Sequence, residues 1–190
     1  MRGLLRMACL VACLVLMPLS ARAAGLEPGP CRLIDPSTCP SANELVRSSG
    51  FVEALGHFTT GGKASYFKAH RSLSEQALSG LGGSTENAVA LPNKHYLFVG
   101  CTSRECRGDA TAVILNEYGQ IEALGFSSFH CDAVCDEARH LDFYFRKDTQ
   151  DDALLAALKS WGTGDKLHKS LLRPEVDDGI DGRMDVHVIP

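Results

Sequence analysis

Hydrophobic and polar residues alternate, or apolar residues run without interruption, in four short stretches of the second half of the chain. Such patterns are typical of β-strands, because successive side chains point to opposite faces of a sheet. They predict strands over 95–100, 110–116, 120–127 and 141–146, with the second and third joined as a hairpin across 117–119. The last strand is expected to be buried on one face only.

Helical spacing of apolar residues lies on both sides of these strands. Ser41 is expected to cap a short helix, and two more short helices are expected within 63–81, the second opened by a capping box at Ser72. An amphipathic pattern over 152–161 predicts a helix entered at Thr149. Because helices and strands occur in separate runs, the expected fold class is α+β, with a mainly antiparallel central sheet of about five strands and short helices packed on one face.

The composition fits one globular domain. The chain has 190 residues, of which 45% are hydrophobic and 22% are charged, and these values exclude disordered and fibrous proteins. The formal net charge is -4 and no run of Lys or Arg is present. A protein that binds nucleic acid through a basic face is therefore not expected.

Residues 1–23 have the pattern of a secretory signal peptide. Arg2 and Arg6 precede an apolar stretch over 7–20, and an A-x-A cleavage sequence at 21–23 follows it. The stretch is shorter than a membrane span and no second one follows, so the exported protein is expected to be periplasmic and free of the membrane. In the alternative interpretation, Cys13 would carry a lipid anchor, but the apolar residues continue beyond it.

Cleavage would leave 24–190 as a single domain. Three arginines leave with the signal peptide, so the net charge falls from -4 to -7 and the exported protein is distinctly acidic. The segment 26–40 is rich in Pro and Ser and is expected to form an irregular N-terminal arm. The segment 175–190 is polar and Gly-rich and is expected to form a C-terminal tail that is partly mobile.

Six cysteines remain after cleavage, and an even number in an oxidising compartment predicts disulfides. They form three close pairs in the sequence: Cys31 with Cys39, Cys101 with Cys106, and Cys131 with Cys135. This spacing favours three local bridges. In the alternative pairing, the third pair joins the first and ties the N-terminal arm to the domain.

The sequence lacks the common signatures of hydrolases, nucleotide-binding proteins and zinc proteases, which favours a binding protein without a cofactor, a metal or an enzymatic activity. His130 and His140 flank the third cysteine pair and have the residue types of a zinc site, but an exported protein is expected to oxidise those cysteines to a disulfide. Asp177, Asp181 and Asp185 are spaced as in a calcium loop that lacks its bidentate glutamate, so a solvated acidic segment is expected there.

The second cysteine pair closes a loop between two predicted strands. Its six residues are Cys101, Thr102, Ser103, Arg104, Glu105 and Cys106. A ring of this size holds its tip in few conformations, and its two charged residues favour a loop that protrudes from the domain. A rigid polar loop loses little entropy on binding, as an inhibitor that plugs another protein's site requires. In the alternative interpretation, the loop only staples two strands together.

The strand, loop and hairpin over 96–115 resemble those of the Ivy family, the bacterial inhibitors of vertebrate lysozyme. The likeness continues upstream, where 66–91 is similar to the family's helix pair. In that family the loop reads C-K-P-H-D-C and is followed by a glycine and a strand. Arg104 stands here in the place of the family's histidine, and Glu105 keeps the acidic neighbour.

The resemblance implies a periplasmic α+β protein, often a homodimer, whose loop enters the cleft of lysozyme and faces its two catalytic carboxylates. It implies c-type lysozyme as the partner and Arg104 as the residue that binds the carboxylates. A second candidate target is a bacterial lytic transglycosylase or a murein-degrading toxin, against which the protein would act as an inhibitor or immunity factor. A candidate from another class is a thiol-disulfide or metal-binding protein built on Cys131 and Cys135.

Overall fold

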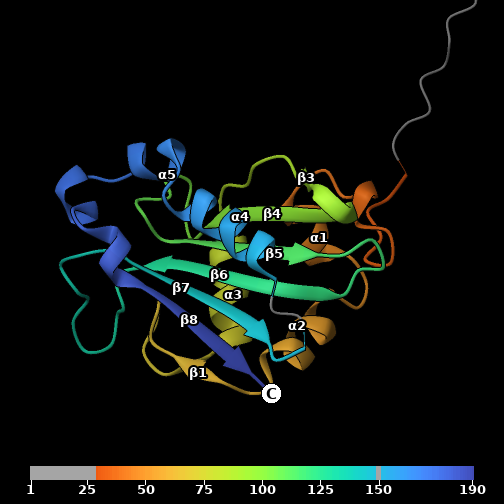
Figure 1. The fold of residues 1–190 in the computed structure, drawn as a ribbon, viewed down its shortest axis with the longest axis horizontal. Coiled ribbons are helices and arrows are strands. Elements are labelled where there is room, and N and C mark those ends of the chain that lie inside the picture. The colour runs from red at the N-terminus through yellow and green to blue at the C-terminus, as the bar shows by residue number, and fades with distance from the viewer. Residues whose placement is uncertain (1–28, 149–150) are drawn as a thin grey trace, which may run out of the picture.

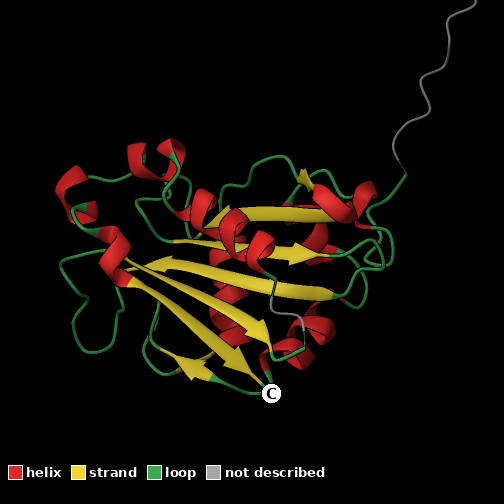
Figure 2. Ribbon diagram, viewed as in Figure 1, coloured by secondary structure: helices red, strands yellow, loops and turns green. Residues whose placement is uncertain are grey.

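The computed structural model describes residues 29–148 and 151–190. Its centre is a six-stranded sheet in the order β3-β4-β5-β6-β7-β8, in which every pair of neighbours is antiparallel except β7 and β8 (Figures 1 and 2). The predicted α+β class with a mainly antiparallel sheet is confirmed. The predicted signal peptide, with Cys13, and the helix entry at Thr149 lie outside the described residues.

The strands of this sheet are β3 (Val89–Leu91), β4 (His95–Cys101), β5 (Ala110–Leu115), β6 (Ile121–Ser128), β7 (His140–Arg146) and β8 (Met184–Ile189). The four strands predicted from periodicity are β4 to β7, and each is found within one residue of its expected bounds. The hairpin between β5 and β6 turns at Gly119, whose φ of 78° lies in the left-handed region that glycine adopts without strain. Local pattern was therefore sufficient to place the centre of the sheet.

Helices cover both faces of the sheet, which corrects the prediction that they pack on one (Figure 1). One face carries α1 (Ala42–Arg47), α2 (Phe51–Thr59) and α3 (Leu73–Leu81), and the other carries α4 (Asp152–Gly162), which is followed by α5 (Asp165–Lys169). The connection from β7 to its parallel neighbour β8 has to cross one face, and α4 lies in that crossover. As a result β7 is buried on both faces, not on one as expected: even Asp142 is only 3% exposed.

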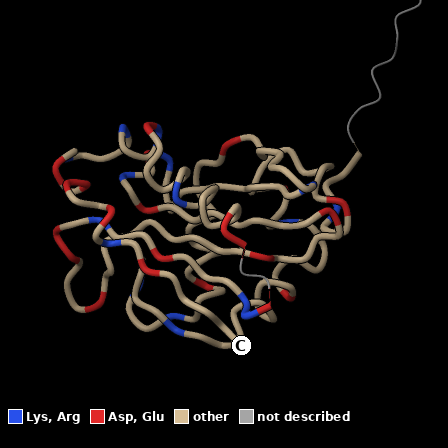
Figure 3. The backbone as a smooth tube through the Cα atoms, in the orientation of Figure 1, with Lys and Arg blue, Asp and Glu red and all other residues tan. Residues whose placement is uncertain are grey.

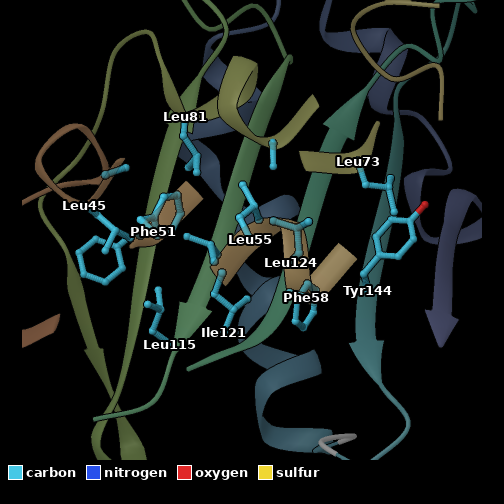
Figure 4. Packing of buried hydrophobic residues seen from close by; sticks show 14 of the residues in the cluster. Leu45, Phe51, Leu55, Phe58, Leu73, Leu81, Leu115, Ile121, Leu124 and Tyr144 are labelled. Atoms are coloured by element: carbon cyan, nitrogen blue, oxygen red, sulfur yellow. The ribbon is translucent and has the colours of Figure 1, made fainter. Parts of the chain in front are cut away.

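Two hydrophobic clusters lie on opposite sides of the sheet. The first packs α1, α2 and α3 against side chains such as Leu115 and Leu124 (Figure 4). The second packs Leu154 and Leu158 of α4 against inward side chains of the other face, including Phe143. Because helices cover much of both faces, the loops that join the strands are the exposed positions at which polar side chains are most free to bind a partner.

The segment between α2 and α3 differs from the prediction. In place of the first of the two expected helices, the chain forms a small two-stranded sheet, β1 (Lys63–Ala64) and β2 (Arg71–Ser72). The buried amide of Gln76 explains this, because its Nε2 donates to the carbonyls of Ala64 and Lys68 at 2.8 and 2.6 Å and holds the segment in a non-helical form. The second helix is α3, and the predicted capping box at Ser72 is present.

The C-terminal segment forms regular structure held by pairing, which differs from the expected partly mobile tail. It contains two 3-10 helices, Pro174–Asp177 and Ile180–Arg183, and then β8. The fully buried Arg139 donates from Nη2 to Asp177 Oδ2 at 2.8 Å and from Nη1 to Ser127 Oγ at 2.8 Å. This arrangement could not be predicted from the polar composition of the segment, because the residues that hold the segment, Arg139 and strand β7, lie far away in the sequence.

The three cysteine pairs form the predicted local disulfides, Cys31–Cys39, Cys101–Cys106 and Cys131–Cys135, so the alternative pairing between the first and third pairs is wrong. In the part of the chain that the structure describes, no helix is both long and apolar enough to cross a bilayer. Along the described part of the backbone, Lys and Arg are interspersed with Asp and Glu (Figure 3).

Candidate functional site

The loop closed by Cys101 and Cys106 is held in a tight conformation where β4 ends. The backbone N–H of Thr102 donates to the carbonyl of Asp109 at 3.0 Å, and that of Asp109 donates to the carbonyl of Cys106 at 3.0 Å. Cys106 and Arg107 both have a φ of 55°, a left-handed conformation that is uncommon for residues other than glycine. Such a backbone persists only where its surroundings determine it, and here the disulfide and the two hydrogen bonds do so.

One side of the loop rests against the chain that follows α3. The N–H of Gly83 donates to the carbonyl of Cys101 at 2.8 Å, that of Cys101 donates to Ser84 at 2.9 Å, and that of Ser84 donates to Ser103 at 3.2 Å. The loop is therefore braced along this side, while Ser103, Arg104 and Glu105 at its tip are exposed. This arrangement fixes the direction in which the tip faces.

The two charges at the tip differ in their pairing. Glu105 accepts from Nε of Arg107 at 2.9 Å and forms an ion pair with it. Among the described residues, the guanidinium of Arg104 has neither a hydrogen-bond partner nor an ion-pair partner. The loop thus presents one unpaired positive charge with five N–H donors in a planar fork, a geometry that matches carboxylates.

An apolar hollow of about 620 Å³ opens beside the loop. Its lining comes from β3, β4, α4, α5 and the loop itself, and it includes Leu97, Val99, Trp161 and Arg104. Two further lining residues, Lys166 of α5 and Glu86, form an ion pair at 2.9 Å. The site therefore combines a positive tip with a neighbouring apolar depression, which sequence reasoning missed because the lining residues come from segments far apart in the chain.

Gly83 allows the loop to approach its support. A Cβ at this position would lie 2.4 Å from the carbonyl oxygen of Cys101 and 2.7 Å from the nitrogen of Ser103, and both are backbone atoms that cannot turn aside. Gly83→Ala is therefore expected to push the loop away and to lower the free energy of unfolding by about 1–3 kcal/mol. Urea unfolding measures the loss.

Gly56→Ala is the matched control, because nothing lies within 4 Å of the Cβ that it would add in α2. This control should be neutral or slightly stabilising, since alanine favours helix more than glycine does by about 1 kcal/mol. Equal stability of the Gly83→Ala and Gly56→Ala proteins would contradict the proposed role of Gly83.

Asp109, at the base of the loop, carries an unfavourable buried charge. Burial raises the pKa of its carboxyl to about 6, and its Oδ1 has no hydrogen-bond partner among the described residues. In the unfolded chain the same group has a pKa of about 3.9, so the folded protein loses stability as the pH rises from about 4 to 6.

Asp109→Asn should therefore raise the free energy of unfolding at pH 7 by about 2 kcal/mol and leave it unchanged at pH 4. Urea titrations at the two pH values measure the difference. Asp181→Asn, at an exposed position, is the control and should give no such dependence. A gain of the same size at both pH values would argue against an ionised Asp109.

A second group of polar side chains lies near the start of β7. The buried carboxylate of Asp142 accepts from His130 Nε2 and from His187 Nε2, each at 2.7 Å. Burial acts to raise the pKa of Asp142, but these hydrogen bonds outweigh it and hold the pKa below its ordinary value. The hydrogen bond to Asp142 in turn raises the pKa of His130, while burial lowers that of His140.

Two other sites considered from the sequence were a zinc site with cysteine ligands and a calcium loop. The residues of both are engaged in other contacts in the structure. Cys131 and Cys135 are joined to each other, so they offer no thiolates to a zinc ion in this structure. Both carboxylate oxygens of Asp177 are bonded to Arg139, and Asp181 and Asp185 lie on different elements, so the three do not form a calcium loop.

Comparisons with known proteins gave no match: no family model, no curated protein and no solved structure is similar to this chain.

Proposed function

We propose that this protein is an exported, periplasmic inhibitor of lysozyme and that c-type lysozyme is its target. In this proposal it acts by inserting the loop closed by Cys101 and Cys106 into the substrate cleft of the enzyme. The observation that carries the proposal is the unpaired, exposed guanidinium of Arg104 at the tip of a braced, disulfide-closed loop. The resemblance of 96–115 to the Ivy family supports the same mode of action. In this proposal the protein is a binding protein, not an enzyme.

The chemistry of the target explains why an arginine is suitable at the tip. A glycosidase of the lysozyme type uses two carboxyl groups, one protonated as the general acid and the other ionised. A guanidinium between them donates hydrogen bonds to both and favours their ionised forms, because a neighbouring positive charge lowers the pKa of a carboxyl group. Arg104 would thus exclude substrate and also remove the proton that the enzyme needs.

The shape and charge around the loop add to binding. The hollow lined by Leu97, Val99 and Trp161 offers apolar area next to the tip, where a lip of the cleft can be buried. After loss of the signal peptide the net charge is -7, which attracts a basic lysozyme over long range. Since salt screens such attraction, the association rate is expected to fall as ionic strength rises.

A turbidity assay with c-type, g-type and i-type lysozymes tests this proposal. The purified protein, with its disulfides formed, should slow the clearing of peptidoglycan by the c-type enzyme at a 1:1 ratio. Absence of inhibition with all three classes would overturn the proposal of a lysozyme inhibitor. Inhibition of a bacterial lytic transglycosylase or of a murein-degrading toxin instead would assign the loop to the second candidate target.

A further inference from the structure

The histidines beside the third disulfide converge on one carboxylate. The bridge between Cys131 and Cys135 closes the short connection that leads from β6 to Asp136 and on to β7. His130 Nδ1 lies 3.9 Å from Asp136 Oδ2, and His140 Nε2 lies 3.3 Å from the same oxygen. One ligand atom from each of the three residues lies within 4.8 Å of the other two.

These separations are close to those of a metal site. Ligand atoms bound to zinc at about 2.0–2.1 Å in a tetrahedron lie roughly 3.3 Å apart. The distance from His140 to Asp136 already has this value, and the distance from His130 exceeds it by a fraction of an ångström. All three side chains are partly exposed, which gives an ion a path of entry from solvent.

A second carboxylate orients His130 from behind. Nε2 of His130 is bonded at 2.7 Å to Asp142, which is 3% exposed and is itself held by His187. A neutral imidazole that donates from Nε2 has its lone pair on Nδ1, the atom that faces Asp136. A carboxylate behind a histidine ligand is the recurrent arrangement that fixes the ring and its tautomer in metal sites.

From this geometry we infer that His130, Asp136 and His140 form a binding site for Zn²⁺, with Nδ1, a carboxylate oxygen and Nε2 as ligands and water at the open position. Two imidazoles and one carboxylate suit an ion of intermediate softness such as zinc. The rings of His130 and His140 stack with centroids 4.2 Å apart, so binding requires the His140 ring to tilt out of the stack. The cysteines serve here as a staple that positions Asp136, not as ligands.

Calorimetric titration of the metal-free protein with zinc chloride, with the disulfides kept oxidised, tests the site. The expected result is one zinc ion per chain. Asp136→Asn and His140→Ala should each weaken binding by about 100-fold or more, since even outer-shell partners of a metal typically contribute 10- to 100-fold. Neither variant removes a partner of the buried Asp142, which is bonded to His130 and His187, so the fold is expected to be preserved.

His70→Ala is the matched control. His70 is exposed, and its Nε2 lies 3.3 Å from Oδ1 of Asp132, a residue inside the loop closed by Cys131 and Cys135. His70 is not one of the three proposed ligands. Its loss should leave zinc affinity unchanged. Failure of the native protein to bind zinc at 1:1, binding that survives both ligand variants, or an equal loss in His70→Ala would each overturn the inference. Because none of these readouts involves lysozyme, the zinc site and the proposed inhibition can fail separately.

Discussion

Replacing Arg139 with alanine is expected to lower the free energy of unfolding by about 3–5 kcal/mol, because it removes both hydrogen bonds that the guanidinium donates to Asp177. The carboxylate of Asp177 is only 10% exposed and would keep only its contact with His168 among the described residues. The same guanidinium also donates to Ser127 on β6, so its loss releases the contact between the C-terminal segment and the sheet. Urea unfolding followed by circular dichroism measures the effect.

Since a loss of this size is a large part of the stability of an ordinary domain, a second variant keeps the prediction testable. Arg139→Met combined with Asp177→Leu removes both charges and should recover most of the stability, because an apolar replacement of a buried ion pair is often neutral. Arg47→Ala, at an exposed position in α1, is the control and should change little. A double variant no more stable than Arg139→Ala would show that the ion pair is not the source of the loss.

Replacing Arg104 with alanine is expected to abolish most of the inhibition of c-type lysozyme. Truncation of one partner of a charge pair that is buried on binding costs about 2–5 kcal/mol, which corresponds to at least about a 30-fold rise in the inhibition constant. The fold should not change, because among the described residues Arg104 has no hydrogen-bond or ion-pair partner. The inhibition constant and the urea midpoint, measured on the same preparation, separate the two effects.

Arg71→Ala provides the matched control, because it removes one positive charge from an exposed position on β2, outside the loop. It should leave the inhibition constant within about twofold of the native value, since exposed single charges contribute little. Equal inhibition constants for the Arg104→Ala and native proteins would contradict the proposal that Arg104 binds the catalytic carboxylates.

The parts of the fold that depend on local chemistry were predictable. Strands β4 to β7 follow from periodicity, and the capping box at Ser72 from its spacing. The three disulfides follow from the close pairing of cysteines, because a short loop is easily closed. The loop of the candidate site could be located in the same way, since both of its cysteines and both flanking strands are contiguous in the sequence.

The parts that depend on distant partners were not predictable. The β8 strand has a polar, Gly-rich surrounding sequence, and it is ordered by pairing with β7 and by the contact of Arg139 with Asp177. The second covered face of the sheet could not be inferred from the helix α4 alone, because an amphipathic stripe does not say which face it covers. The hollow beside Arg104 likewise arises only when α4 and α5 are placed against β3 and β4.

The most direct test of the central claim, that the loop occupies the substrate cleft, is a competition titration. Binding of the protein to c-type lysozyme is measured by calorimetry at increasing concentrations of a chitin oligosaccharide that fills the same cleft. Insertion of the loop predicts that the apparent Kd rises linearly with the concentration of free oligosaccharide, because it varies inversely with the fraction of clefts that is left empty. An apparent Kd that stays constant at saturating oligosaccharide would contradict the account, because the loop would then bind elsewhere on the enzyme.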